Sequence, residues 1–406
     1  MKPFKIDTVD ENKVNEIKEI LMKEKIRHIY LNFVDFSGNL RTKMVGVKEL
    51  INNTHVSWFN GISINGSLIE DFKINKDSDW LVIIPDPDSF RIIPFIQEEE
   101  QKSAMLMCYI KEFELDTRRK LLEATNELIS MGYCPIAGTE LIYKCEEQDE
   151  NQDFYYTLAT SKKTKFNNKL VNALIDSGID VEYYMPYGKN HNRIDLVPDI
   201  VINSADKIET AKWFANNLSS EISYKINFNN IKEKEISTCP VHLSIWKENR
   251  EKNLFFDIND EIELSELGRR FINGILYFNR FIKSTITATT QNEVLSYKTR
   301  YSTQRDDSLM QVPLYFKEKL KKDRIGWSKR TVFQGINADC NLYLVFSALL
   351  YAGIYGIENK IEKIENRLDN YTTEELIDEV ETNKYFKQKF GDAIINRIIE
   401  NLKNKF

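Results

Sequence analysis

Apolar residues dominate one stretch of the chain, residues 330–357. A short β-prone run at residues 331–333 is followed by a polar turn at residues 335–339, and then by a segment that is apolar on nearly all sides. Apolar positions on every face of a helical period predict a buried helix. The segment is interrupted by Gly353 and Gly356 and is too short to span a membrane. The pattern therefore predicts a strand, a turn and a core helix.

The amino-terminal part of the chain has the pattern of a small domain built from a helix and a sheet. Residues 11–25 carry apolar positions at helical spacing, and residues 28–47 alternate like two strands joined by a turn at residues 36–39. Asp35 ends the first of these strands, where a carboxylate either forms the turn or contacts a ligand. The Pro-Asp-Pro-Asp sequence at residues 85–88 lies between two β-branched runs and predicts a second hairpin.

The rest of the chain alternates longer helices with strands. Helical periods occur in four segments, residues 118–131, 168–177, 205–224 and 265–283. Residues 241–246 alternate like a strand. The tail, residues 373–406, predicts two amphipathic helices divided near Gly391.

Composition narrows the class of protein. A chain of 406 residues is long enough for two domains, and 42% hydrophobic with 29% charged residues is ordinary for a soluble globular protein. A net charge of −6 with acids and bases interspersed argues against nucleic acid as a partner. The five cysteines show no CxxC spacing, and the amino terminus lacks an apolar signal segment, so we expect a cytoplasmic protein without membrane attachment.

Motifs along most of the chain resemble those of the glutamine synthetase family, in the family's order. They are residues 35–38 for its D-x-x-G hairpin, 59–64 for F-D-G-S-S-I, 241–246 for G-M-H-x-H-x-S-L-W and 330–344 for RIExRxPDxxxNPYL. The resemblance implies an α+β fold. It implies a small amino-terminal β-grasp domain at residues 1–104, and a large catalytic domain at residues 105–406 with a curved, mainly antiparallel sheet and helices.

The family joins a carboxylate to an amine by way of an acyl phosphate made from ATP. Such a reaction requires Mg²⁺ or Mn²⁺, held by hard oxygen ligands, to neutralise phosphate charge. The resemblance places two of the family's metal ligands at Glu140 and Asp195. Residues of other types stand at the four remaining ligand positions, namely Ile142, Tyr187, Pro240 and Val332. His191 is a candidate for a replacement metal site with Glu140, although a loop histidine is more often only solvated.

Other family contacts are matched singly. Asp35 matches the aspartate that helps bind ammonium, which makes it the candidate catalytic residue and implies that it faces a subunit boundary. His242 and Ser244 match nucleotide-facing positions and Arg330 a phosphate-facing one, and for His242 a core role explains the sequence equally well. Arg305 replaces the flap glutamate that accepts a proton from ammonium, so a cation stands where the reaction needs a base. The register of residues 314–329 is not fixed by the resemblance.

Three functions are compatible with this combination of kept and replaced residues. The loss of the metal ligands favours a glutamine-synthetase-like protein that has lost glutamine synthetase activity. Such a protein would act as an oligomeric binding or regulatory protein, a homo-oligomeric ring with a possible protein partner and no cofactor. The alternative is a divergent ATP-dependent carboxylate–amine ligase for a different acid or amine, with ATP and Mg²⁺ or Mn²⁺ as cofactors. Ordinary glutamine synthetase is the weakest hypothesis, because its metal chemistry would proceed through apolar side chains.

Overall fold

The computed structural model describes most of the chain. The described residues are 3–4, 9–53, 55–73, 80–98, 101–145, 161–187, 190–228, 238–291, 294, 296–304, 307–313, 328–364 and 370–405. Arg305 and residues 314–327 lie outside them. Among the described residues, no helix is long and apolar enough to cross a membrane. The five cysteines are free and buried.

The first sheet is built from the amino-terminal strands. These are β1 (Ile26–Val34), β2 (Leu40–Gly46), β3 (Ile62–Asn65), β4 (Trp80–Pro85), β5 (Arg91–Glu98) and β6 (Gln101–Ile110). Their order is β2-β1-β6-β4-β3, and β5 also pairs with β6. β1 and β2 form the predicted antiparallel hairpin. The division into two domains stays a prediction, and its boundary at residues 104 and 105 falls within β6.

The second predicted hairpin, at residues 85–88, is wrong. β4 and β5 do not pair with each other, and both pair antiparallel with β6, one after the other along its length. The short turn at Pro87–Ser89 therefore continues the chain in the same direction instead of reversing it. Ser89 anchors this turn, because its hydroxyl accepts a hydrogen bond from the Met107 amide at 2.7 Å and donates one to the Met107 carbonyl at 3.3 Å. The side chain of Ser89 thus bridges the gap in the ladder.

The second sheet carries the cavity described below. Its strands are β7 (Tyr133–Cys145), β8 (Val181–Pro186), β9 (His191–Ile200), β10 (Ile226–Asn227), β11 (Val241–Lys247), β12 (Lys298–Ser302), β13 (Ser308–Gln311) and β14 (Thr331–Phe333). The order is β12-β13-β14-β11-β7-β9-β8, with β10 paired to β7. All described pairs are antiparallel except β12 with β13. The predicted α+β fold with a mainly antiparallel second sheet is confirmed.

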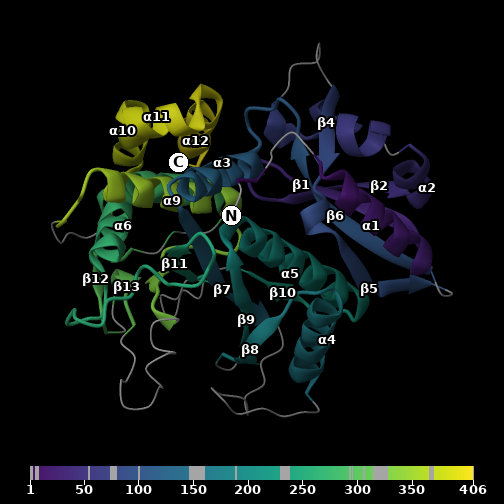
Figure 1. Ribbon diagram of the computed structural model, residues 1–406, viewed down its shortest axis with the longest axis horizontal. Coiled ribbons are helices and arrows are strands. Elements are labelled where there is room, and N and C mark those ends of the chain that lie inside the picture. Colours follow the sequence, from purple (N-terminus) through teal and green to yellow (C-terminus); the bar gives the residue numbers. More distant parts are fainter. Residues whose placement is uncertain are drawn as a thin grey trace.

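Helices pack against both sheets (Figure 1). They are α1 (Glu11–Lys23), α2 (Val47–Asn52), α3 (Thr117–Ser130), α4 (Lys162–Asp176), α5 (Val201–Glu221), α6 (Glu266–Tyr277), α7 (Asn279–Thr289), α9 (Leu342–Glu358), α10 (Thr373–Thr382), α11 (Lys384–Phe390) and α12 (Asp392–Asn404). Two predicted helices are each divided. The segment 265–283 breaks at Phe278, and the tail breaks at Asn383 as well as at Gly391. Asn383 starts a new helix because its side chain caps the amide of Phe386.

The predicted core helix is α9, which packs against α3 and α6 near the centre of the molecule (Figure 1). Nearly all of its residues are buried. Its glycines permit close helix contact. A Cβ atom on Gly356 would lie 2.1 Å from the carbonyl oxygen of Arg270, and one on Gly274 would lie 2.1 Å from that of Ala352. Glycine at these positions lets the backbones of α6 and α9 touch.

Asn341 connects this helix to the first sheet. Its Oδ1 atom caps α9 by accepting the Leu344 amide at 3.0 Å. Its Nδ2 atom donates to the Phe36 carbonyl at 3.0 Å and to the Thr117 hydroxyl, at the start of α3, also at 3.0 Å. Gly38 makes room for this contact, since a Cβ atom there would lie 2.7 Å from the Cα of Asn341. One buried side chain therefore fixes the β1–β2 turn against two helices.

Candidate functional site

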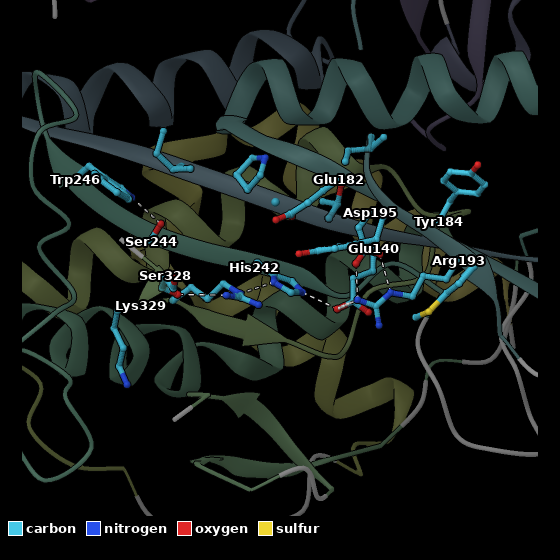
Figure 2. A pocket seen from close by; sticks show the side chains of 18 of the residues that line it. Glu140, Glu182, Tyr184, Arg193, Asp195, His242, Ser244, Trp246, Ser328 and Lys329 are labelled. Atoms are coloured by element: carbon cyan, nitrogen blue, oxygen red, sulfur yellow. Dashed lines mark hydrogen bonds and ion pairs between the residues drawn. The ribbon is translucent and has the colours of Figure 1, made fainter. Parts of the chain in front are cut away.

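A cavity of about 1170 Å³ lies over one face of the second sheet (Figure 2). Its walls come from β7, β8, β9 and β11 and from the segment just before β14. Strand periodicity explains the choice of side chains, because alternate residues of a strand face the same side. His242, Ser244 and Trp246 of β11 line the cavity together. Five residues predicted to bind metal or nucleotide line this cavity, namely Glu140, Asp195, His242, Ser244 and Arg330.

Glu140 and Asp195 are brought together as the sequence predicts. They are directly paired residues on β7 and β9, and both line the cavity. Their side chains are only 13% and 12% exposed, so two negative charges lie side by side with little water to screen them. Such a pair requires a cation.

The cation is Arg193, two residues before Asp195 on the same face of β9. Its Nε and Nη2 atoms donate to the two oxygens of Asp195, each at 2.6 Å, in a two-point ion pair. The same Nη2 atom lies 2.9 Å from Oε1 of Glu140. Burial alone would lower the pKa of Arg193, but the hydrogen bonds that it donates to Asp195 and the charge of Glu140 outweigh burial and raise it. Arg193 is therefore held charged between the two carboxylates (Figure 2).

His242 extends this network toward the other end of the cavity. Its Nδ1 atom accepts a hydrogen bond from Nε of Arg330 at 2.6 Å, and its Nε2 atom lies 2.8 Å from Oε1 of Glu140. An arginine always donates, so Nδ1 of His242 bears no proton. Nε2 must then carry the proton and donate it to the carboxylate. The ring is consequently a neutral imidazole in one tautomer.

The three predicted nucleotide-contacting residues, His242, Ser244 and Arg330, also line this one cavity. The Ser244 hydroxyl accepts a hydrogen bond from the indole nitrogen of Trp246 at 2.9 Å. The guanidinium of Arg330 donates to the Ser328 carbonyl at 3.2 Å. Their contact with a nucleotide stays a prediction, and the structure places them on one wall where a single ligand would reach all three.

Asp35, the candidate catalytic residue, lies in the β1–β2 turn and is not among the residues that line the cavity. Its carboxylate accepts the amide of Asn39 at 2.8 Å and pairs with Arg41 at 2.7 Å. Burial raises the pKa of Asp35 above its ordinary value, and the charge of Asp71 adds to this effect. Of its two sequence interpretations, the turn-forming role is thus observed. A role at a subunit boundary stays a prediction.

A buried apolar contact lies where the resemblance places two further metal ligands. Ile142 is fully buried and Tyr187 is 6% exposed, and the two pack together with Met185 against them. Pro240 offers only its backbone, whose carbonyl accepts the amide of Glu140 at 3.2 Å. Val332 is buried opposite His242 in the β11–β14 pair. These positions supply no side-chain oxygen that prefers a hard cation, except the phenol of Tyr187.

The side chains, as they stand, do not fit a divalent ion. Within the described ranges, no group of three or more histidine, cysteine, aspartate or glutamate side chains is arranged to hold a metal. Glu182 lines the cavity with Glu140 and Asp195 but completes no such group. His191 is buried at the start of β9, paired with Lys144, and does not line the cavity. The replacement site of His191 with Glu140 therefore has no support here.

Arg193 is the site residue that the sequence pattern did not single out. A signal for it exists, because an arginine and an aspartate two residues apart on a strand face the same side. That signal does not show that Glu140 of another strand lies opposite Asp195. Only the pairing of β7 with β9 brings Glu140 and Arg193 together.

Comparison with known proteins adds to this geometry. Residues 111–400 match the family model described as "Glutamine synthetase, catalytic domain". The glutamine synthetase of Thermotoga maritima is 26% identical over 434 residues, covering 95% of this chain and 94% of that protein. The one of Clostridium saccharobutylicum is 26% identical, over 96% and 93% of the two chains. The one of Archaeoglobus fulgidus is 24% identical, over 86% and 81%.

Proposed function

This chain belongs to the glutamine synthetase family, and we propose that it does not make glutamine and instead acts as an oligomeric binding or regulatory protein. The apolar contact between Ile142 and Tyr187 carries this proposal. It occupies two positions where the family resemblance puts metal-binding glutamates. Phosphoryl transfer needs converging oxygen ligands to hold its cations, and side chains of other types at these positions remove two of the family's ligands.

Exposed apolar side chains support the proposal that the protein is an oligomer. Large apolar side chains are exposed on both sheets, among them Leu68 and Trp80 near the first sheet and Tyr183 and Tyr184 on β8. Among the strands that the structure describes, β8 lies at an edge of the second sheet, and an edge strand can pair with a partner chain. We propose a homo-oligomeric ring in the cytoplasm, and native mass spectrometry measures the number of subunits. A monomer at micromolar concentration would contradict the ring.

A second candidate function is an ATP-dependent carboxylate–amine ligase for a different acid or amine. The observation that favours it is the cavity itself, which is large enough for a nucleotide and a small substrate and collects His242, Ser244 and Arg330 on one wall. ATP and Mg²⁺ or Mn²⁺ are its cofactors. This candidate requires metal ligands other than the family's set.

One pair of measurements separates the two candidates. The first is ADP release from ATP, glutamate and ammonium with Mg²⁺ or Mn²⁺, with the Thermotoga maritima glutamine synthetase as the active control. We expect no glutamate-dependent ADP release, and sustained release would overturn the proposal. The second is calorimetric titration of ATP with and without the metal ions. Metal-dependent ATP binding would favour the ligase, and no binding at millimolar ATP would remove it.

A further inference from the structure

The two cavity carboxylates converge on a single atom. Nη2 of Arg193 lies 2.6 Å from Oδ2 of Asp195 and 2.9 Å from Oε1 of Glu140. The positive charge of Arg193 thus lies at the point where a cation shared by both carboxylates would lie. Because Arg193 is on the same strand as Asp195, its guanidinium is present at this point in every folded molecule.

His242, which lies beside Glu140, is also held in a way that does not favour a metal ion. A histidine binds metal through an unprotonated ring nitrogen. Nε2 of His242 donates its proton to Glu140, and Nδ1 accepts from Arg330. Both nitrogens of the ring are therefore engaged in hydrogen bonds, and a metal ion at Glu140 would have to displace Arg193 from both carboxylates.

We propose that Arg193 is a built-in replacement for a divalent cation. Its guanidinium, which has a single positive charge, pairs with both Glu140 and Asp195 permanently, since arginine does not lose its proton in proteins. The wild-type cavity accordingly excludes Mg²⁺ and Mn²⁺, and removal of the guanidinium opens a metal site formed by Glu140 and Asp195. This inference concerns metal binding, and it can fail while the proposed function stands.

The test is a Mn²⁺ titration followed by electron paramagnetic resonance of the free ion, with no nucleotide present. We expect wild-type protein to bind no Mn²⁺ that depends on Glu140, and Arg193→Ala to bind Mn²⁺ at least about tenfold more tightly than wild type. Addition of Asp195→Asn to Arg193→Ala removes the new site. Arg193→Lys, which keeps a positive charge, binds no better than wild type. Arg27→Ala, an exposed arginine on β1, is the control for loss of a positive charge.

Two outcomes would overturn the inference. One is wild-type binding of Mn²⁺ that is lost in Glu140→Gln, because a metal ion would then displace the guanidinium. The other is folded Arg193→Ala, checked by circular dichroism, that binds Mn²⁺ no better than Arg27→Ala. Where Arg193→Ala does not fold, Arg193→Gln takes its place, and the wild-type titration still decides the first outcome. Wild-type Mn²⁺ binding without glutamine synthesis would remove this inference and leave the proposed function standing.

Discussion

Lys329 is a fully buried lysine beside the cavity, and its charge is held by backbone oxygens. Its ammonium donates to the carbonyls of Ile262 and Pro313. Burial lowers the pKa of Lys329 to about 8. In the unfolded chain the pKa returns to its ordinary value, so between the two values the unfolded chain binds a proton that the folded chain does not.

The free energy of unfolding is therefore expected to rise with pH through this residue. The rise is up to about 1.4 kcal/mol per pH unit between pH values of about 8 and about 10. Urea unfolding of wild type and Lys329→Met at several pH values measures it, and the difference between the two proteins should grow in favour of wild type. Lys48→Met, an exposed lysine, is the control and should show no such slope. A pH-independent difference would contradict the prediction.

Single residues at the site were predicted to different extents. Glu140, Asp195, His242, Ser244 and Arg330 follow from local motifs, because each lies in a strand or segment whose own sequence resembles the family's. Arg193 does not, since its role depends on which strand β7 pairs with. For single residues, the sequence thus predicts which side chains lie in the cavity, but not which of their charges pair with one another.

At the scale of elements, the crossing of α6 and α9 depends on two glycines that face each other. The sequence predicts α9 as a buried helix from its apolar pattern, and the structure confirms it. From the sequence alone, Gly356 only interrupts the apolar pattern of that helix. The structure shows its role, because the backbone of α6 lies against the backbone of α9 at this glycine.

Gly356→Ala is expected to lower the free energy of unfolding by about 1–3 kcal/mol, because the added methyl group clashes with the backbone of α6. This loss outweighs the gain of up to about 1 kcal/mol in helix propensity. Gly46→Ala is the matched control, since its Cβ meets no atom within 4 Å and its φ is −70°. Urea unfolding compares the two variants. Equal stability of both would contradict the tight crossing.

Strand pairing was the least predictable feature at this scale. The Pro-Asp-Pro-Asp sequence indicates a turn correctly, but a turn does not specify that the following strand pairs with the preceding one. β5 instead continues along β6 beyond β4. The hydrogen bonds of Ser89 to Met107 make this possible, and they join residues 18 positions apart, which a local pattern does not show.

At the scale of the whole molecule, a buried charge network joins the first sheet to the helices of the second. Arg118 of α3 donates to Asp206 of α5 at 2.6 Å and to Asp86, beside β4, at 2.7 Å. The hydroxyl of Tyr343 on α9 donates to Asp206 at 2.7 Å. The side chain of Arg118 is 2% exposed and those of Asp206 and Asp86 are 6% and 14% exposed, so water screens these charges only weakly.

Arg118→Met is expected to cost about 3–5 kcal/mol of unfolding free energy, because it leaves the buried carboxylate of Asp206 and the partly buried carboxylate of Asp86 without their cation. The triple variant Asp86→Asn, Arg118→Met, Asp206→Asn should regain much of this loss. Guanidinium unfolding followed by fluorescence measures both. Asp88→Asn, which removes an exposed carboxylate with 45% of its side chain accessible, serves as the control. Arg118→Met within about 1 kcal/mol of wild type would show that the network is not needed for stability.

The guanidinium of Arg193 also has a consequence for how such a protein behaves in a cell. A bound metal ion follows the cell's supply, and its occupancy falls when manganese or magnesium is scarce. A cation that is encoded in the chain is present in every folded copy at a ratio of one to one. With Arg193 in the cation's place, the fraction of the protein with a ligand bound in the cavity would depend on the concentration of that ligand alone. Neither a chelator nor metal starvation would change that fraction.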